Sequence, residues 1–184
     1  MKNSIVYTLI IMVGAIAAGW IYQSGAKNEN DLADMEIPSD IDYFLSGLSY
    51  RVMNRNGLLD YDMTSAYLEH FIVADISRIE APDLNIYRTS QNWQINSQQG
   101  ELFHLENSFQ LSQDVVMRRN GDRPLLIRTD KMLFEPDLDL VSGNQEIEII
   151  APNTRITASS AIFNLERRIY SFTNVKAVYH REDS

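Results

Sequence analysis

The pattern of hydrophobic and polar positions changes at about Ile41. From there onward, short runs rich in Ile, Leu, Val, Phe and Tyr alternate with polar residues, and a period of two is typical of half-buried β-strands. Residues 58–72 are the most ambiguous stretch, although they fit strands about as well as a helix. Turn-forming pairs interrupt the runs at Asn56-Gly57, Asn120-Gly121, Gly143-Asn144 and Pro152-Asn153. The pattern predicts one all-β domain over residues 41–182.

A weak internal repeat runs through this region. Three segments about 30 residues apart carry apolar or small residues at matching positions, a spacing typical of stacked repeat units. Chance alternation within any β protein is the alternative, but agreement across three copies favours a repeated three-strand unit. The matching positions are Ile95, Ser97, Gly100 and Leu102, then Ile127, Thr129, Met132 and Phe134, then Ile156, Ala158, Ala161 and Phe163.

The alternation also predicts which side chains face inward. Two facing sheets would bury these side chains and leave the charges outside. Such an interior is either a packed core or an apolar slot of lipid size, and the sequence alone favours the core. The candidate inward positions are Ile79, Leu84, Ile86, Trp93, Ile95, Leu102, Phe109, Leu111, Val115, Met117, Met132, Phe134, Leu138, Leu140, Ile147, Ile149, Phe163, Phe172 and Tyr179.

The N-terminal segment has a different character. Residues 5–22 carry no charge, and as a helix rising about 1.5 Å per residue they span about 27 Å, close to the hydrocarbon thickness of a bilayer. Trp20 and Tyr22 lie at the distal end, where interfacial aromatic residues belong. We therefore expect one transmembrane helix within an anchor over residues 1–22, with the N-terminus in the cytoplasm, followed by a polar tether over residues 23–40. A signal peptide cleaved at Ala15-Ile16-Ala17 is the alternative, and either interpretation exports the domain.

Composition and charge exclude several classes of function. The chain contains no cysteine, so disulfides, thiolate metal sites and cysteine nucleophiles are excluded. The net charge of −9 makes the domain a poor partner for nucleic acids and for anionic membrane surfaces. His70, His104 and His180 lack the spacing of metal ligands.

No group of residues points to an enzyme, a metal or a cofactor. Two carboxylate pairs, Asp137/Asp139 and Glu146/Glu148, would each share one face of a strand and could in principle bind a cation. We favour solvated strand faces for both pairs. The arginine clusters are interpreted in the same way, as solvated charges at hairpin ends; they are Arg118-Arg119 with Arg123 and Arg128, and Arg167-Arg168.

Several segments resemble the LptC family of lipopolysaccharide-export proteins of Gram-negative inner membranes. Residues 47–51, Gly-Leu-Ser-Tyr-Arg, resemble a first-strand segment of that family. The stretch Trp93-x-Ile95-x-Ser97-x-x-Gly100, the element Arg128-Thr129-Asp130 and the hairpin from Asn164 to Tyr179 resemble later ones. The similarity covers nearly the whole chain, and its weight lies in the order and spacing of these short motifs.

The resemblance implies a fold, a location and partners. Family members are single-pass proteins of the inner membrane whose periplasmic domain is a β-jellyroll of the OstA/LptA-like type, open along one side. They bind an ABC transporter (LptB, LptF and LptG), accept lipopolysaccharide from it, hold its acyl chains inside the jellyroll and pass it to the soluble periplasmic protein LptA. The alternative is a membrane-anchored structural adaptor that joins envelope proteins through its strand edges and holds no lipid.

The resemblance and the alternation together indicate site residues. By local alignment, lipid-contact positions of the family match Pro38, Ile79, Tyr170 and Tyr179, and a family glycine falls near Ala151, which leaves any function of that glycine in doubt. The expected lipid-binding residues are Ile79, Leu84, Ile86, Trp93, Ile95, Phe109, Met117, Phe134, Ile149, Phe163, Tyr170, Phe172 and Tyr179. The expected partner edge strands carry Gly47, Leu48 and Tyr50 toward the transporter and Val175, Ala177 and Tyr179 toward the soluble partner.

Overall fold

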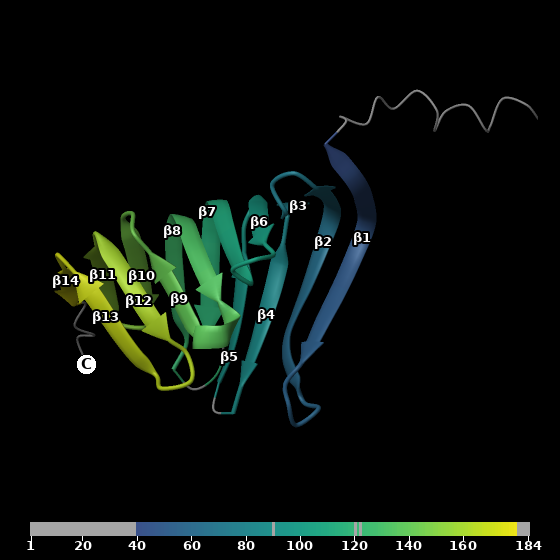
Figure 1. Ribbon diagram of the computed structural model, residues 1–184. Helices are drawn as coiled ribbons and strands as arrows, with labels where there is room; N and C mark the ends of the chain where they lie inside the picture. The colour runs from purple at the N-terminus through teal and green to yellow at the C-terminus, as the bar shows by residue number, and fades with distance from the viewer. Residues whose placement is uncertain (1–39, 90, 120, 122, 180–184) are drawn as a thin grey trace, which may run out of the picture. The chain divides into compact units, whose positions relative to one another are not determined.

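The computed structural model describes residues 40–89, 91–119, 121 and 123–179, and Figure 1 shows their course. The expected anchor and nearly all of the expected tether lie outside these residues. Within them, no helix is long and apolar enough to cross a membrane. The elements are β1 (Ile41–Met53), β2 (Leu59–Phe71), β3 (Ile76–Glu80), β4 (Asp83–Arg88), β5 (Gln91–Asn96), β6 (Gln99–Phe103), β7 (Ser108–Arg119), β8 (Leu125–Glu135), the 3-10 helix η1 (Pro136–Leu138), β9 (Leu140–Gly143), β10 (Ile147–Ala151), β11 (Thr154–Ala158), β12 (Ser160–Asn164), β13 (Ile169–Thr173) and β14 (Lys176–Tyr179).

The strands form two layers that share their long members. In layer one, antiparallel pairing runs β2-β3-β6-β7-β8-β9-β12-β13; in layer two it runs β2-β4-β5-β7-β8-β10-β11-β14. β2, β7 and β8 belong to both layers because each pairs with one set of neighbours in its first half and another set in its second half. Toward the C-terminal end, Figure 1 shows β9, β12 and β13 in front of β10, β11 and β14.

The long strands bend where they pass from one layer to the other. In β7 the register to β8 shifts between Ser112 and Val115, and the two intervening residues have positive φ angles. Such a bulge turns a strand sharply without ending it. At the crossing points of β2 and β8, the hydroxyls of Ser65 and Thr129 donate hydrogen bonds to backbone carbonyls of Glu80 and Glu146. Side-chain hydroxyls thus satisfy carbonyls at the bends.

The core consists of side-chain ladders that cross the pairing strands on the inner face. In layer two, Met63, Leu84, Ile95, Met117, Ile127 and Ile149 are successive register partners. In layer one, Phe109, Phe134, Val141, Phe163 and Tyr170 follow one another in the same way. Every second residue of a strand points to the same face, so the period of two in the sequence becomes these continuous rows.

The repeat has a clear structural basis and one more copy than the sequence analysis counted. Each copy passes from layer two to layer one and back, so its matching positions fall on the same inner rows. In one copy the passage from layer two to layer one is the single strand β8. In the others a bend divides this passage into two strands, which are β5 and β6 in one copy and β11 and β12 in the next. β2, β3 and β4 form the additional copy, in which Met63, Ser65 and Leu68 have the spacing of Ile95, Ser97 and Gly100. The three-strand unit was therefore too simple.

Four details of the expected strands and inward positions were wrong. Leu140 lies on the outer face of β9, because the adjacent Val141 takes the inward position opposite Phe134. Leu138 lies in η1 and is 57% exposed, and Tyr179 is 76% exposed at the sheet edge, so neither side chain faces the core. Asp137 and Asp139 do not share a strand face, because Pro136 starts a 3-10 turn and Asp139 follows it with a left-handed φ of 55°. Glu146 precedes β10, so the second carboxylate pair does not lie on one strand either.

Candidate functional site

The interior between the layers contains most of the residues expected to contact lipid. Tyr170 and Phe172 are half-buried and pack against the edge of this core, and Tyr179 lies outside it. Of the thirteen residues expected to bind lipid, the structure thus brings twelve to one continuous apolar interior and leaves Tyr179 outside it. The buried members are Ile79, Leu84, Ile86, Trp93, Ile95, Phe109, Met117, Phe134, Ile149 and Phe163.

Aromatic side chains join the two layers. The ring of Tyr61, from layer two, meets the rings of Phe109 and Phe134, from layer one, edge to face at centroid distances of 5.8 Å each. Farther along, Trp93 of layer two meets Tyr170 of layer one at 6.2 Å. Perpendicular contacts of this kind add to the area burial of the rings. The inner faces are therefore in contact, and hydrocarbon would have to displace side chains from one another.

Four adjacent turns of layer one form one side of the opening between the layers, here called the mouth. The turns at residues 72–75, 104–107, 136–139 and 165–168 are linked to one another by hydrogen bonds, for example from Leu165 N to Asp139 O at 2.9 Å. The other side of the mouth consists of strand ends of layer two, at Arg88 on β4, Gln91 on β5 and Arg119 on β7. Large exposed side chains line the side formed by layer one; they are Ile72, Val73, Leu105, Leu138 and Ile169.

A buried arginine closes one part of the mouth. The Arg88 side chain is only 6% exposed, and its Nη1 donates to Asp60 Oδ1 at 2.7 Å. Its Nε donates to Asp139 Oδ1, across the mouth, also at 2.7 Å. Two carboxylates therefore compensate the buried charge, as a buried guanidinium requires. The prediction of a solvated Asp139 was wrong, and no local sequence signal links it to Arg88.

A second polar contact lies where β5 and β7 reach the mouth. Arg119 Nη1 and Gln91 Nε2 each donate to the Tyr170 hydroxyl at 3.2 Å. The Arg119 guanidinium also lies 5.4 Å from the centre of the Trp93 ring, within the range of a cation–π contact. Arg119 is thus half-buried and part of an aromatic cluster, which corrects its interpretation as a solvated hairpin-end charge.

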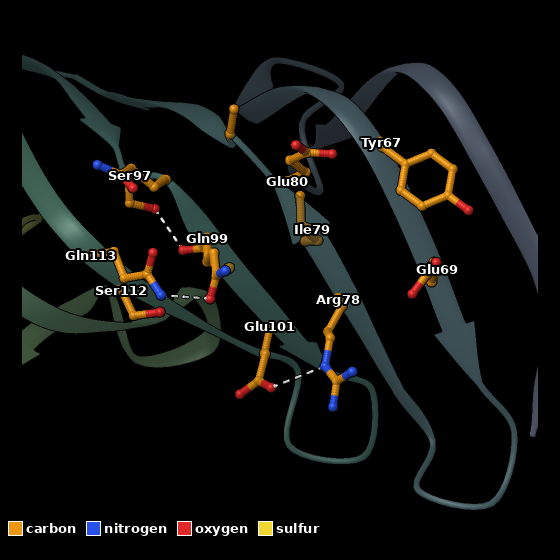
Figure 2. Close-up of a pocket in the computed structure, with 13 residues that line it drawn as sticks. Tyr67, Glu69, Arg78, Ile79, Glu80, Ser97, Gln99, Glu101, Ser112 and Gln113 are labelled. Carbon is orange, nitrogen blue, oxygen red and sulfur yellow. Dashed lines mark hydrogen bonds and ion pairs between the residues drawn. The ribbon is translucent and has the colours of Figure 1, made fainter. Parts of the chain in front are cut away.

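A large surface depression is polar and lies outside the interior. It has a volume of about 890 Å³, and Figure 2 shows its lining from β2, β3, β6 and β7. Arg78 and Glu101 form an ion pair within it at 3.9 Å, and Gln113 Nε2 donates to Gln99 Oε1 at 2.9 Å. Most of its lining side chains are polar or charged, so it does not offer an apolar site for hydrocarbon.

The expected partner edges are open at both ends of the sheet. Within the described part of the chain, β1 pairs only with β2, and β14 pairs only with β11. β1 is 13 residues long and exposes Tyr43, Phe44, Leu45 and Tyr50 to between 39% and 43%. A long edge with exposed apolar side chains is typical of a strand that pairs with another chain. Leu48 is half-buried, Ala177 is exposed, and Val175 lies just before β14.

Gly47 lies on β1 with a φ of 64°, and a Cβ atom there would meet nothing within 4 Å. Replacing Gly47 would therefore strain the backbone rather than crowd this chain. Within residues 40–179, apart from the three not described, no group of three or more potential ligands could hold a metal ion.

A histidine cluster holds the beginning of β1 against β2. His70 Nδ1 lies 2.6 Å from Asp42 Oδ1, and His70 Nε2 lies 3.5 Å from Asp75 Oδ1. Tyr43 stacks on the imidazole with ring centroids 4.7 Å apart. The hydrogen bond with His70 lowers the pKa of Asp42 below its ordinary value of 3.8, and burial opposes this effect.

The lowered pKa predicts an acid-dependent contribution to stability. A carboxyl group whose pKa is lower in the folded state stabilises the fold above its unfolded pKa and loses that contribution as the pH falls through its folded pKa. Asp42→Asn is therefore expected to lower the melting temperature at about pH 5 but to have little effect at about pH 2. Thermal unfolding across this range tests the prediction, with Glu106→Gln as control, because Glu106 is exposed. An Asp42→Asn effect that persists at pH 2 would contradict it.

Comparison with known proteins decides the family. The family model described as lipopolysaccharide-assembly, LptC-related, matches residues 7–180. The chain belongs to the LptC family. This confirms the resemblance found in the sequence, and it confirms that the chain is a transport-system component rather than an enzyme. Membership in the LptC family supports a role in lipopolysaccharide transport.

A solved structure shares the fold of this LptC-family chain. It is LptH, described as the LptA-homologous periplasmic component of the lipopolysaccharide transport device from Pseudomonas aeruginosa. The two superpose with a TM-score of 0.53 at 6% identity, over 66% of this chain and 95% of LptH. At that identity the likeness shows the fold alone, and it confirms the all-β, LptA-like architecture. No curated protein matches the sequence.

Proposed function

We propose that this LptC-family domain carries lipopolysaccharide by holding its acyl chains between the two layers. The observation that carries the proposal is the continuity of the apolar rows. They run from β2 to β10 on the inner face of layer two and from β7 to the open end at β13 on the inner face of layer one. Moving hydrocarbon from water into such an interior yields about 0.8 kcal/mol per CH₂ group. Several acyl chains are thus held without a charged pocket.

The two open edges support a direction for the transfer. β1 is proposed to face the inner-membrane ABC transporter (LptB, LptF and LptG), and β14 with the preceding Val175 is proposed to meet the soluble carrier LptA. Unpaired N–H and C=O groups of an edge strand add a strand from a partner of the same fold. The segment over residues 1–22 is proposed to anchor the chain in the inner membrane, with the β domain in the periplasm.

The packed interior favours a second candidate, an adaptor without lipid. Phe134, Met117 and Ile127 are fully buried, and the ion pairs of Arg88 cross the mouth, so the described conformation holds no chain-sized opening at these side chains. Lipid carriage therefore requires the layers to part at the mouth. An adaptor would keep this core closed throughout and would bind its partners through β1 and β14 only.

Photocrosslinking separates the two functions. A photoreactive phenylalanine derivative at Tyr170, on the inner side of β13, is expected to capture purified lipopolysaccharide added to the full chain in detergent micelles. The matched control is the adjacent Ser171, which is exposed on the opposite face of the same strand. Capture at both positions, or at Ser171 alone, would sink the interior site. No capture at either would favour the adaptor.

A further inference from the structure

The Trp93 indole has an unpaired buried donor. The side chain is 1% exposed, and its Nε1–H has no hydrogen-bond partner in the described structure. Buried indole N–H groups usually find an acceptor, because leaving one unpaired costs stability. Neither the fold nor the packing of hydrocarbon requires this donor, since a phenylalanine ring would also fill an apolar position.

Trp93 lies at the boundary between the apolar interior and the mouth. Its register partner on β4 is Ile86, which lies in the core. Its register partner on β7 is Arg119, which bonds to the Tyr170 hydroxyl at the mouth. The Tyr170 ring meets the indole edge to face from the other layer, and Phe163 lies 5.5 Å from Tyr170 on the side of the core.

The Tyr170 hydroxyl beside Trp93 also has a spare donor. The Tyr170 hydroxyl accepts hydrogen bonds from Arg119 and Gln91, which leaves its own proton without an acceptor among the described residues. Arg119 donates to the Arg123 carbonyl and forms no ion pair with a described carboxylate, unlike Arg88. Spare donors on Trp93 and Tyr170 beside the apolar interior suit a ligand that has an oxygen acceptor at the end of a hydrocarbon chain.

We propose that Trp93 and Tyr170 bind the ester or amide carbonyl of an acyl chain at the mouth, with Arg119 holding the tyrosine in place. The hydrocarbon beyond the carbonyl then lies along the apolar rows, while the remainder of the lipid stays outside. This rests on the proposed function for the presence of an acyl ligand. It adds the chemical group that the mouth recognises and the donors that recognise it.

Trp93→Phe isolates the indole donor, because it keeps an aromatic ring and removes the N–H. We expect the melting temperature of the full chain in micelles to change little, since removing the buried unpaired donor offsets the cost of the space left by the smaller ring. We expect affinity for a monoacylglycerol to fall about tenfold, and affinity for the matching alkyl glycerol ether, which lacks the carbonyl, to stay the same. Tyr170→Phe should reduce the preference for the ester in the same direction. Tyr87→Phe is the control, because that hydroxyl bonds to Asp62 instead.

The indole resonance gives a second readout with lipopolysaccharide itself. The chain has two tryptophans, so the variant assigns the ¹⁵N–¹H signal of Trp93. We expect this signal to move downfield when purified lipopolysaccharide is added. If the unmodified chain binds the ester and the ether equally and the signal does not move, the carbonyl site is wrong. If the photoreactive group at position 170 captures no lipopolysaccharide, the proposed function fails instead. Binding of the monoacylglycerol then still tests the carbonyl site.

Discussion

Phe134→Ala is expected to lower the free energy of unfolding of the β domain by about 3–5 kcal/mol. Phe134 is fully buried at the centre of layer one, where its register partners are Phe109 and Val141. Its ring also meets Tyr61 of the opposite layer. Removing it takes away both the transfer free energy of the ring and the contacts that hold the layers together. Urea unfolding followed by circular dichroism measures the change.

Two variants calibrate this result. Phe134→Leu retains most of the volume and is expected to cost less than about 2 kcal/mol. Ile162→Ala removes a side chain that is 49% exposed on the outer face of β12, and its expected cost is below about 1 kcal/mol. If Phe134→Ala cost no more than Ile162→Ala, the layers would not be packed against each other in solution, and the interior would be an open slot.

Single prolines in β14 are expected to separate partner binding from folding. In an antiparallel pair, successive residues direct their N–H groups alternately toward the neighbouring strand and away from it. Of the adjacent residues Ala177 and Val178, one therefore donates toward β11 and the other toward the open edge. Proline removes the donor at whichever position it occupies.

Ala177→Pro and Val178→Pro should consequently differ. One variant should lose stability because it breaks the ladder to β11. The other should keep the melting temperature of the unmodified chain and bind a soluble carrier of the same fold at least about tenfold more weakly. Binding is measured with the purified full chain in micelles, with Ala177→Ser as a control that keeps the donor. Unchanged binding by both prolines would mean that β14 is not the carrier-side edge.

The contacts at the mouth determine how the domain opens. The interior rows and the open edges are compatible with lipid transfer, but Arg88 and its two carboxylates, together with the contact between Arg119 and Tyr170, hold the mouth closed. A lipid that enters from the mouth has to exchange these contacts for its own. A carbonyl that binds Trp93 and Tyr170 would offset part of that exchange.

The local pattern of the sequence determined the strands and most of the interior. A period of two assigns each strand residue to one face without knowledge of its neighbours, so residues such as Leu84, Ile95 and Phe163 were placed correctly inside. The repeat was undercounted because the copy at β2–β4 has His70 where the next two have Leu102 and Phe134. Its three-strand unit was too simple because bends divide some of the strands. Leu138 failed because Pro136 ends the strand and starts a tight turn.

The amino-acid pattern alone therefore predicted an all-β domain that resembles the LptC family, its apolar faces and a segment suited to a membrane anchor. Which polar groups pair and which stay unpaired depends on the three-dimensional arrangement of the strands. Arg88 and Asp139 are 51 positions apart, as are Arg119 and Tyr170, and no local period links such residues. Their contacts exist because strands of opposite layers end at the same mouth. The unpaired Trp93 N–H likewise depends on what surrounds it in three dimensions.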